Sequence, residues 1–434
     1  MPLSRRSKGM PAVPMTRARP PEDRPRSFEP GFKRLLAATT VSGLGDGMRT
    51  TAFAVFAAAL SDDPIQVALV TVCTRLPWLF VGPYAGALVD HVNRWRALWI
   101  CDVARALVLA AFIVLIQVDR VGIAVLAVAA FVLSSIETMA DNLSQAVVPD
   151  VVGTSSLNQA NSRLMGGQFV STDFLGAPLG TTLFAITRSF PFIVDSISFA
   201  LSAVLVFGTR GRGGHRASGA ARTTLRRLHT EMAEGLRWLW RHRTLRTVCV
   251  LIGLLNFSVL AVLSTAVLYA LHALKIDQRA YGLLLVVVAV GGLAGLLLAP
   301  RIVAAIGPAR SLRLAFAVCP LALLVGAVTS HALFAASALT LVGASISLAT
   351  VVTTTLRQEV IPTELFGRVN GGYRLVVNGL SPLGGLAGGL VATAFGLRAP
   401  FVLATVVMAG VTAVSFLALS GRALAAPGPT VDAT

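Results

Sequence analysis

The sequence predicts an all-α membrane protein with twelve transmembrane helices in two pseudo-symmetric bundles of six. Of its 434 residues, 55% are apolar and 13% are charged, about half the charged share of a soluble domain. The apolar residues fall in runs of about 18–25 residues, and each run is long enough to cross roughly 30 Å of hydrocarbon as a helix. Run length decides the assignment, because most runs are apolar on every face.

The two halves of the chain resemble each other about 210 residues apart. The segment Gly43–Asp46 recurs as Gly253–Asn256, and Pro178–Gly180 recurs as Pro382–Gly384. Many secondary carriers are built from such a duplication, with the two copies related by an axis along the membrane normal. The repeat therefore predicts a substrate path between the halves, near the middle of the membrane.

We expect the spans, in chain order, at residues 35–59, 65–88, 97–118, 121–142, 160–186, 190–208, 247–271, 280–299, 312–330, 332–355, 370–394 and 399–420. These spans divide the chain into five parts. A disordered basic cytoplasmic tail (1–32) precedes the N-terminal bundle (33–208), a cytoplasmic linker (209–246) leads to the C-terminal bundle (247–421), and a short C-terminal tail (422–434) follows.

The end of the linker, Glu231–Arg243, has the pattern of an amphipathic helix, with tryptophans suited to headgroup depth. We expect this helix to lie on the inner membrane surface. A soluble partner bound by the same helix is the alternative.

The net charge of +17 reflects basic residues in the first tail, in the linker and in alternate loops. This alternation follows the positive-inside rule and predicts that both termini and the linker are cytoplasmic. It also argues against a nucleic-acid-binding groove. Abundant Ala, Arg and Gly with few Lys favour a bacterial inner membrane.

Motifs for other chemistry are missing from the sequence. The single cysteines have neither metal-ligand nor redox spacing, and no GxxxxGK[ST] loop or GxSxG elbow occurs. We therefore expect no enzymatic activity, no cofactor, no metal site and no ATP drive.

A charged loop between the second and third spans has the pattern Gly86, three residues, Asp90, three residues, Arg94. Gly86 lets a neighbouring helix approach closely, and Asp90 can meet Arg94 or a helix N-terminus. We interpret the loop as a conformational latch that stabilises one arrangement of the helices. Asp141 and Arg105 are candidate members of this latch.

This loop resembles the signature loop of the major facilitator superfamily, and the resemblance extends from about residue 32 to residue 422. The stretches PWLFVGPYAGALVD, SFPFIVDSISFALSA and EGLRWLWRHRTLR resemble the branch of macrolide-efflux and enterobactin-exporter-like carriers, which are drug:proton antiporters. The resemblance implies two rocking bundles and export of a drug or siderophore-like molecule in exchange for protons.

The fifth span contains Gly176, Pro178 and Gly180, which resemble part of the fifth-helix motif of these antiporters. Small residues and a proline also let two helices pack closely and bend, which is the simpler interpretation. Pro382 is expected to bend the eleventh span in the same way.

Ionisable groups inside spans are costly and each needs a reason. Asp46 and Arg75 lie about ten residues into the first and second spans, hence at similar depth, and are a candidate ion pair. Arg49, one turn beyond Asp46, competes with Arg75 for the same carboxylate. Asp173 is also near mid-depth, and Glu137 is the next candidate. We expect the two acids Asp46 and Asp173 and the two arginines to leave the interior of the protein with nearly no net charge. Asp46 or Asp173 then carries a proton or faces a cationic substrate, or else forms a permanent salt bridge.

The second half differs, because its expected spans contain no acidic residue. Asn256 takes the place of Asp46, and Asn378 is a further polar candidate. An apolar wall with a few neutral polar groups favours a bulky hydrophobic substrate.

The sequence therefore predicts a monomeric exporter whose partners are a small-molecule substrate, protons and the lipid bilayer. An importer or facilitator of a metabolite in the same fold is one alternative. A non-transporting scaffold or sensor that works through Glu231–Arg243 is another. Substrate identity, proton stoichiometry and oligomeric state are not encoded in these patterns.

Overall fold

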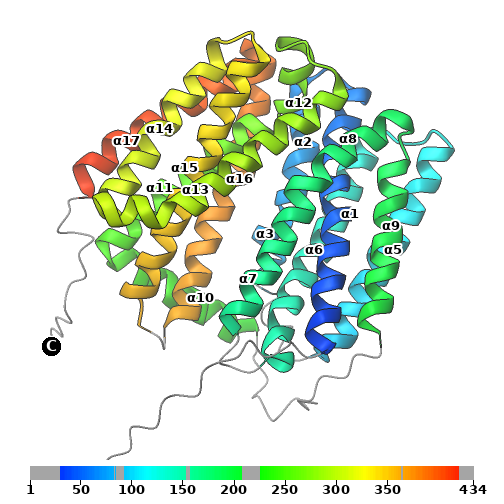
Figure 1. Ribbon diagram of the computed structural model, residues 1–434, viewed down its shortest axis with the longest axis horizontal. Helices are drawn as coiled ribbons and strands as arrows, with labels where there is room; N and C mark the ends of the chain where they lie inside the picture. Colours follow the sequence, from blue (N-terminus) through cyan, green and yellow to red (C-terminus); the bar gives the residue numbers. More distant parts are fainter. Residues whose placement is uncertain are drawn as a thin grey trace, which may run out of the picture.

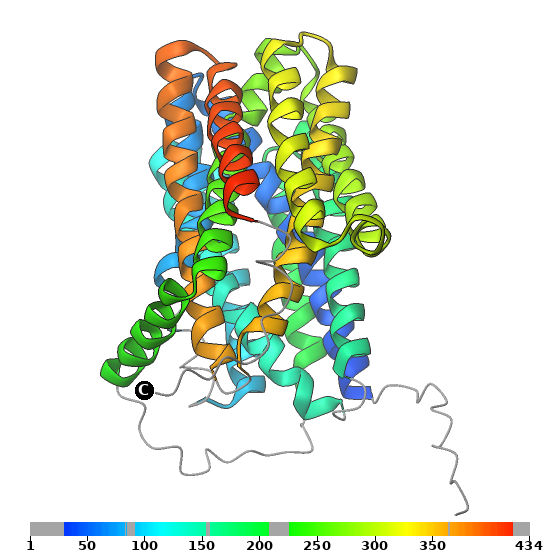
Figure 2. The same ribbon diagram turned by 90° about the vertical axis from the view of Figure 1, so that its left-hand side faces the viewer.

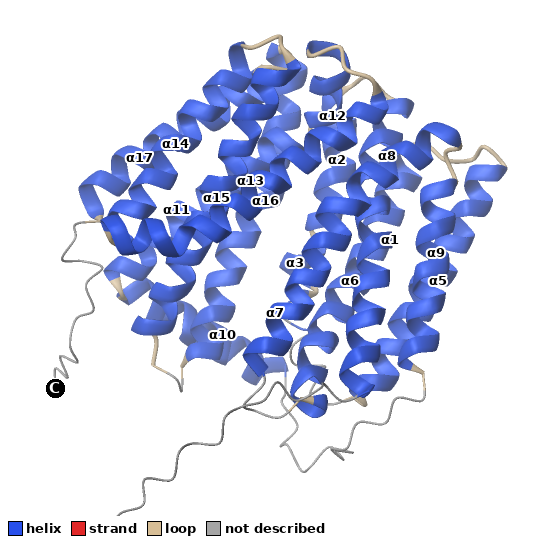
Figure 3. Ribbon diagram, viewed as in Figure 1, coloured by secondary structure: helices blue, strands red, loops and turns tan. Residues whose placement is uncertain are grey.

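The computed structural model describes residues 30–82, 84, 92–152, 157–207, 225–362 and 365–419. This part of the chain consists of helices joined by short loops and contains no strand (Figure 3). The N-terminal half contains α1 (Pro30–Leu60), α2 (Pro64–Arg75), α3 (Pro77–Phe80), α5 (Arg94–Gln117), α6 (Ile123–Val151), α7 (Leu157–Gln168), η2 (Phe169–Gly176), α8 (Ala177–Ile186) and α9 (Phe190–Val206). The linker and the C-terminal half contain α10 (Leu225–Arg241), α11 (Arg243–Leu263), α12 (Ala266–Leu268), η3 (Tyr269–Ala273), α13 (Gln278–Ile306), α14 (Pro308–Val328), α15 (Ala332–Val360), α16 (Phe366–Phe395) and α17 (Ala399–Ala418).

These helices confirm the all-α membrane fold. Within the described residues, nine helices are long and apolar enough to cross a membrane. The other three expected spans correspond to Pro64–Phe80 and Phe190–Val206, which are shorter apolar helices, and to α1, which carries Asp46 and Arg49 in mid-helix. The second span is interrupted at Pro77, which lacks an N–H to donate to the preceding turn.

Helix packing repeats between the halves, which lie side by side in Figure 1, the N-terminal half on the right. Within the first half α1 packs against α8 and α9, α2 against α6, and α5 against α6 and α9. Within the second half the equivalent pairs are α11 with α16 and α17, α13 with α15, and α14 with α15 and α17. The internal repeat seen in the sequence is therefore a repeat of helix packing.

Close approaches at glycines are part of this packing. Gly176 meets the backbone of Gly47, so a Cβ added to Gly176 would lie 2.8 Å from the Gly47 Cα. Gly180 in turn faces the backbone of Met48. Where α1 lies against it, the fifth span takes the wider π turn over Phe169–Gly176, and Pro178 is the second residue of α8, which follows. The expected distortion of the fifth span is thus present.

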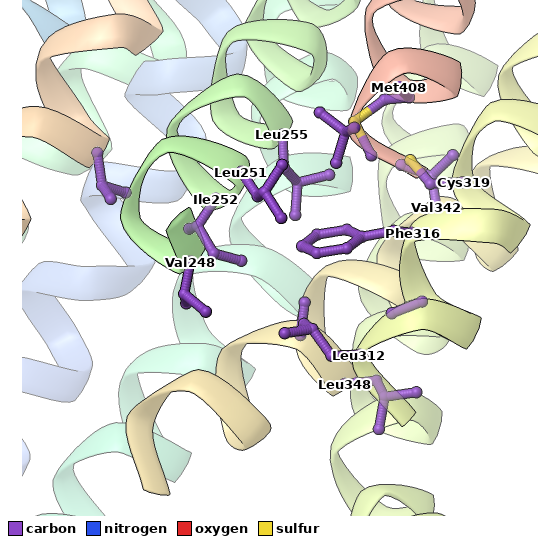
Figure 4. Packing of buried hydrophobic residues seen from close by; sticks show 14 of the residues in the cluster. Val248, Leu251, Ile252, Leu255, Leu312, Phe316, Cys319, Val342, Leu348 and Met408 are labelled. Atoms are coloured by element: carbon purple, nitrogen blue, oxygen red, sulfur yellow. The ribbon is translucent and has the colours of Figure 1, made fainter. Parts of the chain in front are cut away.

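The C-terminal core shows how the apolar runs are used. In Figure 4 the ring of Phe316 points from α14 toward Leu251 and Leu255 of α11, with Val342 of α15 nearby. All four side chains are buried or nearly so. Pro382 lies inside α16 and is buried as well.

We name the side at which α1, α5 and α7 begin the inner side. At the outer side the two halves are packed together, mainly through α16 on α2 and α13 on α8. A Cβ on Gly389 would lie 2.6 Å from that of Ala68, and the Thr393 hydroxyl donates to Asp63 over 3.2 Å. This packing closes the outer side.

The linker helix α10 is amphipathic, as expected, and it lies at the inner end of the C-terminal half, beside the start of α16 (Figure 2). Arg368 of α16 pairs with Glu234 at 2.9 Å and lies 3.8 Å from Glu231. Gly235 faces the Arg368 backbone. The helix is therefore docked on protein as well as placed at the inner side.

Candidate transport site

Arg49 of α1 is the centre of a buried ionic network. Its side chain is 1% exposed and contacts three carboxylates. The Nη2 atom lies 2.5 Å from Asp46 and 2.8 Å from Glu137 of α6, and Nε lies 2.9 Å from Asp195 of α9. Three helices of the N-terminal half thus meet at one guanidinium.

Local sequence makes this meeting possible. Gly45, one residue before Asp46, faces Asp195 and Ser198 of α9, and a Cβ at that position would overlap both side chains. The Ser198 hydroxyl donates to the Asp195 backbone carbonyl at 2.8 Å. The glycine therefore lets α1 approach α9 closely enough for Arg49 to reach a carboxylate there.

Arg105 of α5 extends the network toward the inner side. It donates to Asp102, one turn away, and its Nη1 lies 3.7 Å from Asp46. Its guanidinium also lies 4.0 Å from the ring centroid of Phe199. The Ser202 hydroxyl donates to Asp102 at 2.7 Å. Arg105 is thus part of the buried network, and its charge also acts on Asp141, the other latch candidate.

The network has more acids than bases. Four carboxylates, of Asp46, Asp102, Glu137 and Asp195, surround the two guanidinium groups, a formal excess of two negative charges if all are ionised. Isolated buried charge is costly unless it is neutralised. The cluster is therefore not the set of two acids and two arginines that the sequence predicts, and it is formally neutral only with two of its carboxylates protonated.

Asp195 is the residue that sequence reasoning missed. It is 0% exposed and lies inside the apolar run of the sixth span. The rule that singled out Asp46, an ionisable side chain inside a span, applies equally to Asp195. Asp102 belongs to the network as well, where it pairs with Arg105.

Arg75 is not the partner of Asp46, which pairs with Arg49 instead. Arg75 of α2 and Asp173 of η2 are both exposed, and the charge of Arg75 acts on the Asp173 carboxylate. Both α2 and η2 contact helices of the second half, α16 and α13 respectively. Arg75 and Asp173 are thus charged residues outside the buried network around Arg49.

The candidate latch is only partly described. Gly86 and Asp90 lie outside the described residues. Arg94 begins α5 and donates to the Ala146 carbonyl of α6 at 3.0 Å. Asp141 lies deeper, where Arg374 of α16 acts on it electrostatically across the two halves.

A cavity of about 540 Å³ lies inside the N-terminal bundle on its inner half. Its walls come from α1, α5, α6, α7 and α9, and include Asp46, Asp102, Arg105, Asp141 and Ser202. Within the described ranges, no three His, Cys, Asp or Glu side chains are arranged to hold a metal ion.

The second half contributes neutral groups and, unexpectedly, two arginines. The Asn256 amide donates to the Val377 carbonyl at 3.5 Å, and Asn378 is half-buried. The guanidinium of Arg357 lies 4.1 Å from the Tyr373 ring centroid, and that of Arg374 lies 5.1 Å from the Trp78 ring centroid. Arg374 therefore brings a positive charge of the second half to the first, whereas Arg357 is held within the C-terminal bundle.

Comparison with known proteins gives a family. A family model described as "Transmembrane secretion effector" matches residues 28–424. The chain is 26% identical over 274 residues to "Multidrug efflux pump Tap" of Mycobacterium tuberculosis, which covers 61% of this chain and 63% of that protein. It is 27% identical over 184 residues to "Uncharacterized MFS-type transporter YfiS" of Bacillus subtilis, with 41% of this chain and 42% of that protein covered.

Solved structures share the fold. A bacterial homologue of the lysosomal transporter spinster, in an inward-facing and occupied conformation, superposes with a TM-score of 0.71 at 13% identity, over 92% of this chain and 98% of that chain. A bacterial homologue of the iron transporter ferroportin, in the inward-facing state, gives a TM-score of 0.68 at 17% identity, over 88% and 98% of the two chains.

Proposed function

The chain belongs to the transmembrane secretion effector family of the major facilitator superfamily, and we propose that it exports a hydrophobic or amphipathic small molecule in exchange for protons. Membership in this family makes the protein a membrane transporter and not an enzyme. The scaffold or sensor interpretation is accordingly set aside. The energy source, the substrate class and the direction of transport are the proposed parts.

The observation that supports proton exchange is the acid excess around Arg49 and Arg105. Three buried carboxylates and the part-exposed Glu137, set against two guanidinium groups, favour bound protons whenever the cluster is shielded from water. A neighbouring arginine favours the charged form of a carboxyl group, and burial disfavours it. A change in these contacts between conformations would bind and release protons, and Asp46 is our choice for the central carrier.

The substrate path runs between the halves. Arg75 and Asp173 are exposed charged residues of the N-terminal half, and the second half would offer Asn256 and Asn378 among mostly apolar residues, with Arg357 and Arg374 as its charged groups. Asp173 gives this path a counter-charge for an amphipathic cation, and the apolar walls favour a bulky molecule. The closed outer side is consistent with loading from the inner side.

We place the transporter in a bacterial plasma membrane as a monomer, with both termini in the cytoplasm. Export agrees with the efflux activity named for the mycobacterial relative, which this chain matches over 63% of that protein's length. Import of a metabolite in the same fold is the competing function. The loop from Gly86 to Arg94 would stabilise the outward-facing arrangement on the inner side.

The test uses everted membrane vesicles from cells with and without the protein. Ethidium and erythromycin are added outside the vesicles, and uptake is followed after energisation, with and without a protonophore. We expect protein-dependent uptake that the protonophore abolishes. Uptake driven by a sodium gradient alone would refute proton exchange, and movement of neither probe would refute the substrate class. Protein-dependent loss of probe from preloaded vesicles, without uptake from outside, would favour an importer.

A further inference from the structure

We propose that the cavity inside the N-terminal bundle is the route by which protons leave the buried carboxylate network for the cytoplasm, separate from the substrate path between the halves. We name it the N-bundle cavity. This inference rests on the proposed proton exchange and adds the place where the proton leaves the protein.

The lining of the N-bundle cavity comes from the first half alone. At its inner end it includes Asn161 near the start of α7 and Val206 at the end of α9. At its deep end it includes Asp46 and Arg105, which belong to the network. The cavity thus leads from the inner ends of the helices to mid-membrane without passing between the halves.

The cavity suits water. A volume of about 540 Å³ far exceeds the roughly 30 Å³ that one water molecule occupies in the liquid. Its walls carry carboxylates, hydroxyls and amides, including those of Ser144 and Gln145. Water in such a site has several hydrogen-bond partners and can relay protons to Asp46 and Asp102.

Arg105 leaves one donor unpaired at the wall of the cavity. Its side chain is 4% exposed and lines the cavity. Its Nε has no hydrogen-bond partner in the described part of the protein, although the terminal nitrogens bind Asp102 and Asp46. A buried N–H normally finds an acceptor, and a small movement of the cavity wall would let a water oxygen reach this one.

Asp141 of α6 connects the cavity to the second half. The charged groups that act on it are Glu137 on its own helix, Asp46 on α1, Arg105 on α5 and Arg374 on α16. Arg374 lies over Trp78 of the first half, 5.1 Å from its ring centroid. Ionised Asp141 attracts Arg374 and draws the halves together at the inner side, whereas protonated Asp141 does not.

This arrangement determines the order in which proton release, closure of the inner side and substrate export take place. With the inner side open, protons leave through the N-bundle cavity, and the negative charge left on Asp141 favours closure onto Arg374. The substrate held between the halves is then carried outward. Because the proton and the substrate use different routes, blocking one route should leave binding at the other intact.

The test narrows the cavity in the full-length protein reconstituted in liposomes. Ser144→Phe on α6 and Asn161→Phe on α7 block it from two walls. Ser135→Phe, also on α6 but outside the cavity, is the matched control. We measure ethidium transport driven by a pH gradient, and ethidium–ethidium exchange without a gradient, which needs alternating access but no net proton release.

We expect both cavity variants to lose gradient-driven transport while exchange stays at the level of Ser135→Phe. Retained exchange also shows that each variant is folded. Gradient-driven transport at the control rate would overturn the proposed route, and parallel loss of exchange would mean that the cavity carries the substrate. Absence of gradient-driven transport in the unaltered protein would instead overturn proton exchange itself, and the inference with it.

Discussion

Arg49 Nε and Asp195 Oδ2 lie 2.9 Å apart although 146 positions separate the two residues in the sequence. Both side chains are almost completely buried, at 1% and 0% exposure. The pair joins the first and sixth spans, and through Arg49 it is continuous with Asp46 and Glu137. One guanidinium therefore holds the inward-pointing carboxylates of three helices.

Removing that guanidinium should destabilise the N-terminal bundle. Arg49→Met leaves Asp46, Glu137 and Asp195 without their shared partner, and breaking a buried pair in this way costs about 3–5 kcal/mol. Thermal unfolding of the purified protein in detergent measures the loss. Arg120→Ala, an exposed arginine outside the network, is the control, and an equal effect of both variants would contradict the central role of Arg49.

Asp46→Asn should abolish proton-coupled export while the protein remains in the membrane. The amide keeps the size of the side chain, so folding is preserved, but it neither ionises nor binds a proton. Ethidium export in vesicles and membrane abundance are measured together, with Asp119→Asn in an exposed turn as the control. Export at the full rate would show that Asp46 is not the coupling carboxylate.

Asp173→Asn should weaken interaction with a cationic substrate and leave proton coupling intact. Asp173 is exposed, so its contact with a cationic substrate should contribute what an exposed charge pair contributes, about 0.2–1 kcal/mol. The measurement is the KM for ethidium, which should rise a few-fold. A normal KM with a lower maximal rate would place Asp173 in proton transfer.

Asp141 and Arg374 should act as a unit. The charge of Arg374 acts on Asp141, and in a double-mutant cycle with Asp141→Asn and Arg374→Gln, coupled groups give interaction energies of about 0.5–3 kcal/mol. The transport rate of the double variant should then match that of the worse single variant. Arg368→Gln, which breaks the ion pair with Glu234 at the protein surface, provides a comparison, and strictly additive effects for Asp141 and Arg374 would exclude contact between the halves at this point.

Gly389→Val should loosen the closed outer side. A Cβ at this position would already press on Ala68 and Ile65 of α2, and overpacking of such a contact costs about 1–3 kcal/mol. Thermal stability should fall accordingly. The control is Gly410→Val on α17, where a Cβ meets nothing within 4 Å, and equal stability of the two variants would mean that α2 and α16 do not need this close approach.

Much of the site could be predicted, because an ionisable residue inside an apolar run is visible in the sequence. Asp46, Arg49 and Glu137 were found in this way and are brought together in the structure. Asp195 carried the same signal within Phe190–Val206 and was overlooked. Arg374 was not predictable as a partner of Asp141, because the first half gives no information on which face of α16 will meet it.

Composition and run length alone determined that the chain is a helical membrane protein, because a bilayer accepts only segments that are long, apolar and internally hydrogen-bonded. The duplication likewise determined that the helices pack as two equivalent sets. Tertiary structure decided which charges meet: Asp46 binds Arg49 and not Arg75, and Arg105 turns inward to Asp102. The depth of a residue along a helix can be counted from sequence, but its partner depends on helix rotation and on close approaches such as that at Gly45, which only the packed bundle establishes.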